Sequence, residues 1–231
     1  MKRILSFIDW IKQEKIRFFS SSNFREEMAN WISHALGVLF GALAGGWMLI
    51  LAFEQQSLGC FVATGVYVAS FILLYSSSTL YHIFHAHPKR KIFRLLDHIS
   101  IYVLIAGSYT PFLVCYMDNF TGRIYLWILW VLVVLGSLFK LLFLGRYKWI
   151  SLLLYLFMGW IAVFIFPVFY NELPIYSFVG IVVGGLFYSL GVVFYVWKRL
   201  YFNHFIWHLF VMAGSISHFV AVYYSIVSLQ K

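Results

Sequence analysis

Charged side chains are scarce in this sequence. Only 11% of its 231 residues are Asp, Glu, Lys or Arg, and only eight of these are acidic, whereas about a quarter of a soluble domain is charged. This scarcity, with a hydrophobic content of 63%, excludes a soluble globular protein. The apolar residues fall into runs of about twenty, the length that spans a bilayer as a helix. The sequence therefore predicts a polytopic all-α membrane protein with no soluble domain.

Cysteine is scarce too, since Cys60 and Cys115 are the only two. Two cysteines are too few for a disulfide framework, and their spacing is not that of a metal site. Both lie at the same end of neighbouring apolar runs, so a disulfide between them could form. We favour the alternative, in which both are unpaired and serve as small apolar residues.

Seven apolar runs predict a seven-transmembrane helix bundle. Fifteen of the Lys and Arg residues lie in the N-terminal segment and in the second, fourth and sixth loops, against two on the opposite side. This bias predicts a cytoplasmic N-terminus and an extracytoplasmic C-terminus, and it explains the net charge of +9 without nucleic acid as a partner. Residues 1–30 form a cytoplasmic segment, either an interfacial amphipathic helix or an unstructured basic tail. The membrane domain covers residues 31–231, with spans at roughly 31–53, 57–80, 97–116, 122–144, 149–170, 175–197 and 204–227.

Glycines and prolines inside the predicted spans indicate how the helices pack and bend. Gly37, Gly41 and Gly45 recur every four residues in the first span, which predicts a face for close helix packing. Pro111 and Pro167 each lie inside a predicted span, where proline is expected to kink the helix.

Ionisable residues gather at the predicted cytoplasmic ends of four spans, and the opposite ends carry no histidine. Such groups are costly within a membrane and usually mark a site or a pathway. This asymmetry is the main functional signal in the sequence. The residues concerned are His34, His82, Asp97, His98, His204 and His208.

A metal site is the most specific interpretation of this group. His204 and His208 are four residues apart, so they lie on one helical face, one turn apart, and two imidazoles so placed can bind one metal ion. His82 is the best candidate for a third ligand. Three histidines leave one position of a tetrahedral zinc open for water, which is the pattern of catalytic sites. Imidazole also suits copper and iron, but the ligand type and number favour zinc.

Two further polar residues have alternative interpretations. Asp97 could accept the proton of the water at the metal, or it could cap the third helix at its N-terminus. Ser78 lies one turn before His82. Its hydroxyl could bond to that water or to a substrate carbonyl, or it could bond back to its own helix.

Four segments occur in a distinctive order: EEMANWISHALG (26–37), SSSTLYHIFH (76–85), RLLDHISIYVLIAGSYTPF (94–112) and HFIWH (204–208). They resemble the successive motifs of the hemolysin III family, the bacterial branch of the progestin and adipoQ receptors, which is related to alkaline ceramidases. The resemblance runs from about residue 26 to the C-terminus. It implies a bacterial inner-membrane protein with zinc held by His82, His204 and His208. The family's aspartate and serine match Asp97 and Ser78, and its N-terminal motif places Glu27, Asn30 and His34 beside the site.

Two functions fit these features. The first is a zinc-dependent hydrolase, similar to a ceramidase, that cleaves a lipid amide or ester in the inner leaflet. The second is a non-enzymatic membrane-homeostasis or sensor protein whose zinc is structural. The family name also suggests a pore-forming cytolysin, which fits less well because packed apolar helices lack a continuous polar lining.

The remaining histidines lie outside the predicted metal site. His218 is fourteen residues beyond His204, about 21 Å along a helix, so it cannot share the metal. We interpret it as a hydrogen-bonded interior residue, with a proton relay as the alternative. His85 and His87 are predicted to be solvated in the second loop.

Overall fold

Helices make up all the regular structure in residues 22–229, which are the residues that this computed structural model describes and which contain no β-strand. Six of them are long and apolar enough to cross a membrane. Their outward side chains are largely apolar, as expected where lipid is the solvent. The all-α prediction is confirmed, while the predicted amphipathic segment lies mostly outside the described residues. The six helices are α2 (Ser22–Glu54), α3 (Leu58–Ile83), α4 (Arg90–Cys115), α5 (Phe120–Phe143), α8 (Ile175–Val196) and α9 (Asn203–Ser228).

The fifth predicted span is broken. It consists of α6 (Lys148–Gly159), the 3₁₀ helix η1 (Trp160–Val163) and α7 (Phe166–Glu172), with a bend of 53°. The structure thus has six unbroken candidate spans, or seven if this bent pair counts as one. Pro167 lies in the first turn of α7, where its missing N–H is tolerated, so the prediction of a disruption at Pro167 is confirmed. Helix α4, in contrast, continues through Pro111.

A tyrosine on α4 satisfies the backbone at this break. The Tyr109 hydroxyl donates to the carbonyl of Gly159 at 2.5 Å and accepts from the N–H of Ala162 at 3.0 Å. Broken helices are stable at membrane depth only where the freed backbone groups find partners. Tyr109 therefore allows α6 to end in the middle of the bundle.

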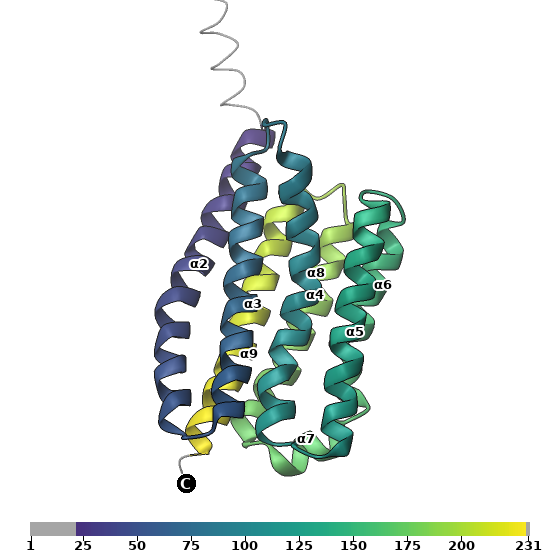
Figure 1. Ribbon diagram of the computed structural model, residues 1–231. Coiled ribbons are helices and arrows are strands. Elements are labelled where there is room, and N and C mark those ends of the chain that lie inside the picture. Colours follow the sequence, from purple (N-terminus) through teal and green to yellow (C-terminus); the bar gives the residue numbers. More distant parts are fainter. Residues whose placement is uncertain (1–21, 230–231) are drawn as a thin grey trace, which may run out of the picture.

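The helices pack as neighbours in chain order. Figure 1 shows α2, α3, α4 and α5 side by side, with α6, α8 and α9 behind them. Helix α9 packs against both α8 and α2 and so closes the bundle. This closure brings the start of α9 beside the end of α3, at the end of the bundle where α2 begins. We call this the histidine end.

Glycines let α2 approach α3 closely. A Cβ added to Gly41 would lie 2.8 Å from Phe71 Cδ1, and one added to Gly45 would lie 2.7 Å from Val68 Cγ1. Real Cβ contacts are not this short, so the predicted close-packing face is confirmed. The approach also carries His34, which lies one turn before this face, into the interior of the bundle.

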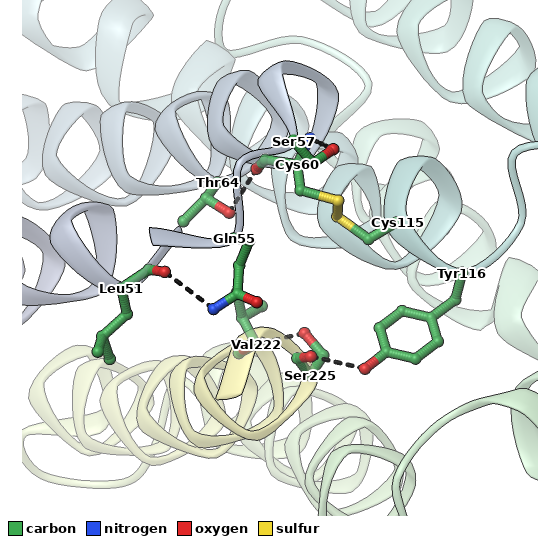
Figure 2. Close-up of a disulfide and its surroundings, with 9 residues drawn as sticks. All are labelled: Leu51, Gln55, Ser57, Cys60, Thr64, Cys115, Tyr116, Val222 and Ser225. Atoms are coloured by element: carbon green, nitrogen blue, oxygen red, sulfur yellow. Dashed lines mark hydrogen bonds between the residues drawn. A yellow bond between two sulfur atoms is a disulfide. The ribbon is translucent and has the colours of Figure 1, made fainter. Parts of the chain in front are cut away.

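Cys60 and Cys115 form a disulfide, which corrects the interpretation that they are unpaired. Figure 2 shows the bond between the start of α3 and the end of α4, with the two Cα atoms 5.4 Å apart. This separation is normal for a disulfide, and it arises because α3 and α4 are antiparallel neighbours. Ser57 fixes the start of α3 by accepting a hydrogen bond from the N–H of Cys60 at 3.3 Å. We call this opposite end of the bundle the disulfide end.

Candidate metal centre

Three histidines converge at the histidine end. His82 lies in the last turn of α3, and His204 and His208 lie in the first turns of α9. Their ring centroids are 4.6 to 5.2 Å apart, and one ligand atom of each lies within 4.8 Å of the other two. The structure therefore brings together the three residues that the sequence analysis selected.

The orientation of the rings fits a metal ion. The Nε2 atoms of His204 and His208 are 3.2 Å apart, close to the separation of about 3.3 Å expected for two ligands of a tetrahedral zinc with bonds of about 2.0–2.1 Å. His82 donates from Nδ1 to Glu27 Oε2 at 2.5 Å, which leaves its Nε2 buried and without a hydrogen-bond partner in the described chain. Three neutral imidazoles of this kind could hold a metal, and imidazole donors are compatible with zinc, copper or iron.

Glu27 joins this centre to a basic residue. Its second oxygen, Oε1, accepts from Arg90 Nη2 at 2.8 Å, and the neighbouring Glu26 accepts from the backbone N–H of His204 at 3.2 Å. A carboxylate on Nδ1 fixes the tautomer and orientation of a ligating histidine. From the sequence, Glu27 is expected near the site without a role and Arg90 is only a topology signal, because nothing local links residues 63 positions apart.

His34 and Asn30 approach the centre from α2. The ring of His34 stacks on His208 with centroids 3.7 Å apart and an interplanar angle of 23°, and its edge meets Tyr75 at 4.9 Å. Both ring nitrogens of His34, and Oδ1 of Asn30, are buried without a hydrogen-bond partner among residues 22–229. Polar atoms left unpaired at this depth indicate that a ligand, an ion or water completes the site.

Asp97 lies inside α4, which corrects its interpretation as an N-cap. Helix α4 begins at Arg90 and its N-cap is Lys89, so Asp97 is about two turns into the helix. Its carboxylate lies 3.5 Å from His98 Nδ1, too far for a good hydrogen bond. It lines the same cavity as His204 and His208.

Ser78 faces this cavity as well. Its side chain is buried, and its hydroxyl has no hydrogen bond to any residue of the described chain, unlike Ser77 and Thr79, which bond back to carbonyls of α3. The alternative in which Ser78 bonds back to its own helix is therefore wrong.

Two cavities meet at the histidines. The inner one, of about 120 Å³, lies between α4, α6, α8 and α9 and is lined mainly by apolar side chains, with His34, His204 and His208 at one end. The outer one, of about 580 Å³, is polar and is bordered by Glu26, Glu27, Arg90 and Lys198. Burial lowers the pKa of Lys198, which lies between α8 and α9. The histidine cluster thus separates an apolar chamber from a polar vestibule.

The other histidines differ in their surroundings. His218 donates from Nε2 to the carbonyl of Ile181 at 3.3 Å, which confirms a hydrogen-bonded interior position. His87 is exposed, as predicted. His85 departs from the prediction, since it is partly buried and its Nδ1 donates to the carbonyl of His82 at 3.2 Å.

Known proteins are similar to this chain over most of its length. The family model described as Haemolysin-III related matches residues 22–219. The chain is 40% identical over 204 residues to Hemolysin-3 of Bacillus cereus, covering 88% of this chain and 93% of that protein. It is 39% identical to the Hemolysin-3 homolog of Bacillus subtilis (strain 168), covering 86% and 93%. The human Monocyte to macrophage differentiation factor is 28% identical over 206 residues, covering 86% and 83%.

Proposed function

This chain belongs to the haemolysin-III-related family of integral membrane proteins, and we propose that it is a zinc-dependent hydrolase of a lipid amide or ester. One observation carries the proposal: of the three histidines arranged to hold a metal, His204 and His208 line an apolar cavity together with Asp97, whose carboxylate has no strong hydrogen bond within the described chain. Metal, proton acceptor and lipid-compatible space are the three elements that such a hydrolysis needs.

The chemistry follows from these residues. A zinc ion held by His82, His204 and His208 would polarise the substrate carbonyl and make water more acidic. Asp97 then accepts a proton from the attacking water and returns it to the leaving amine or alcohol. The C–N or C–O bond breaks, and a carboxylic acid and an amine or alcohol are released. Ser78, whose hydroxyl has no partner within residues 22–229, can donate to the carbonyl oxygen in the same cavity.

The apolar lining of the inner cavity favours a lipid as the substrate. Its lining extends from the histidines to Trp160, whose side chain is 39% exposed at the break after α6. An acyl chain can therefore lie in the apolar part while the group to be cleaved lies near the metal. The polar vestibule beyond the histidines can take the headgroup and supply water.

Two observations favour a cytoplasmic histidine end, and therefore an inner membrane as the location. The loops at this end hold most of the Lys and Arg residues, which mark the cytoplasmic side. The disulfide lies at the opposite end, and disulfides persist in oxidising compartments outside the cytoplasm. The substrate would then be a lipid of the inner leaflet.

A second candidate is a sensor or homeostasis protein with a structural metal. Helices α3 and α9 have few direct contacts, so a metal bound between His82 and His204 would hold these two helices together. A pore is less well supported, because the cavity that reaches the site is mainly apolar and pores for ions are lined by polar groups.

Replacing Asp97 separates these candidates. Zinc-loaded wild type, Asp97→Asn and Asp118→Asn would be reconstituted in bilayers and assayed on a panel of long-chain N-acyl amines and acyl esters. Asp118 is the matched control, since it is exposed at the disulfide end and, among residues 22–229, forms an ion pair with Arg123 alone. The hydrolase predicts that Asp97→Asn keeps its zinc and loses about 100- to 10,000-fold in turnover, while Asp118→Asn is unchanged. If the wild type turns over no lipid of the panel and Asp97→Asn keeps full function in cells, while His208→Ala unfolds the protein, the structural-metal candidate replaces the hydrolase.

A further inference from the structure

The inner cavity has a second polar group at its far end. His218, Ser108 and Tyr188 line it there. His218 is ten residues beyond His208 on α9, which is about 15 Å along a helix. Since the hydrocarbon core of a bilayer is about 30 Å thick, this second group lies near the middle of the membrane.

The ring of His218 presents an unpaired acceptor. Its Nε2 bonds to the carbonyl of Ile181, and a carbonyl can only accept, so the proton is on Nε2 and Nδ1 carries a lone pair. No residue in the described chain donates to Nδ1, and the ring lines the cavity. An acceptor within membrane depth is stable only when a donor meets it.

The surrounding residues hold this ring in place. A Cβ added to Gly184 would collide with Cδ2 of the His218 ring, so the glycine leaves space for the ring in this position. Tyr188 meets the ring edge-on, with centroids 5.4 Å apart, and its own hydroxyl is bonded to Ser215 at 2.8 Å. The ring, which belongs to α9, is therefore held by three residues of α8, namely Ile181, Gly184 and Tyr188, as expected of a built site.

Ser108 adds a second acceptor at this level. Its hydroxyl donates to the carbonyl of Ile105 at 2.8 Å, which uses its only proton and leaves its lone pairs available. Together, Ser108 and His218 offer acceptors and no free donor. A ligand group that pairs with them must be a hydrogen-bond donor.

We propose that His218 is the centre of a second polar subsite, which accepts a hydrogen bond from a hydroxyl carried on the ligand's hydrocarbon chain. This hydroxyl lies about 15 Å from the group held at the histidine end, by the rise of α9. The ligand class is thus a long-chain lipid hydroxylated near the middle of its chain. The inference rests on the proposed function only in placing the ligand's polar end at the three histidines, and it requires binding but no turnover.

Fatty acids that differ by one hydroxyl test this subsite. The purified protein with its metal would be titrated with octadecanoate, 12-hydroxyoctadecanoate and 2-hydroxyoctadecanoate in competition with a fluorescent fatty acid. The second compound carries its hydroxyl at the depth of His218, and the third carries it beside the carboxylate. We expect 12-hydroxyoctadecanoate to bind about three- to tenfold more tightly than octadecanoate, the gain from one hydrogen bond to a buried acceptor.

Variants assign this preference to His218. His218→Phe keeps the ring shape and removes the acceptor, so the preference for 12-hydroxyoctadecanoate is expected to disappear while octadecanoate still binds. His218→Gln retains one donor for Ile181 and one acceptor for the ligand, so it is expected to keep the preference. His87→Phe, in the exposed second loop, is the control for the same substitution outside the cavity and is expected to behave as wild type.

Three results would overturn the inference. The first is equal wild-type affinity for octadecanoate and 12-hydroxyoctadecanoate, which would mean that water alone meets the acceptor. The second is a preference that persists in His218→Phe, and the third is a preference of the same size for 2-hydroxyoctadecanoate that disappears in His218→Phe. The wild-type comparison needs no variant, so a poorly folding His218→Phe protein still leaves a decisive test. A preference for the hydroxylated chain without lipid turnover would support this subsite while contradicting the hydrolase.

Discussion

Replacing Glu27 by alanine removes the acceptor of the hydrogen bond that His82 donates from Nδ1. This bond is 2.5 Å long and is made to a carboxylate whose side chain is 19% exposed, so it is charge-assisted and only partly screened by solvent. Hydrogen bonds to charged groups contribute about 1.5–3 kcal/mol. Loss of such a partner behind a ligating histidine typically weakens metal binding about 10- to 100-fold. We therefore expect the zinc dissociation constant to rise by about this factor.

Equilibrium competition with a chelator would measure this change on purified protein. Glu54→Ala is the matched control, because Glu54 lies at the other end of α2, is exposed and makes no hydrogen bond among the described residues. Its zinc affinity should equal that of wild type. The metal-free Glu27→Ala protein should melt below metal-free wild type, because the hydrogen bonds from His82 and Arg90 are lost without metal as well; the zinc affinities are therefore compared under conditions in which both proteins are folded. A Glu27→Ala protein that binds zinc within about twofold of wild type would refute the orienting role of this carboxylate.

Further predictions concern the fold. Tyr109→Phe leaves two buried backbone groups without partners and should lower the free energy of unfolding by about 2 kcal/mol, measured by denaturation in mixed micelles. The control is Tyr125→Phe, because the Tyr125 hydroxyl has no hydrogen bond within residues 22–229. A Tyr109→Phe cost no greater than that of the control would contradict this prediction. Gly41→Ala should lower the free energy of unfolding by about 1–3 kcal/mol through overpacking against α3. Gly46→Ala, which has nothing within 4 Å of the added Cβ, should be close to neutral in the same assay. Equal losses of stability would be inconsistent with the close approach of α2 and α3. Cys60→Ser should lower stability under oxidising conditions by up to about 4 kcal/mol. It should also abolish the shift in gel mobility that a reducing agent causes in the wild type. An unchanged shift would show that the pair does not form.

The spans and the metal-ligand candidates could be predicted because both depend on local pattern. An apolar run of about twenty residues has few alternatives to a transmembrane helix. The spacing of His204 and His208 places them on one face in any helix. His82 could be added because an ionisable residue at the end of an apolar run is unusual enough to indicate a site.

Helix ends were less predictable, because a helix continues into polar residues once it leaves the apolar core. Helix α4 begins at Arg90, seven residues before the predicted start of that span, and for this reason Asp97 is not a cap. Pro167 predicts a kink but not the full break after α6, since that break depends on Tyr109, a residue about 50 positions away. Pattern analysis of a single segment contains no information about such a partner.

Contacts between segments that are distant in the sequence could not be predicted. The disulfide forms because α3 and α4 run antiparallel with their ends aligned, and two cysteines alone do not reveal this. The contact of Glu27 with His82 and Arg90 likewise depends on the way α2 packs on α3 through its glycines. The sequence therefore indicated which residues are candidates for the site, whereas the structure shows how they are held.

Metal analysis of the purified protein tests the central claim most directly. We expect near-stoichiometric zinc in the wild type, and a large loss of zinc in His82→Ala, His204→Ala and His208→Ala, with His87→Ala unchanged as a control. Full zinc occupancy in all three ligand variants, or a wild-type protein that binds no metal under any condition, would contradict the account.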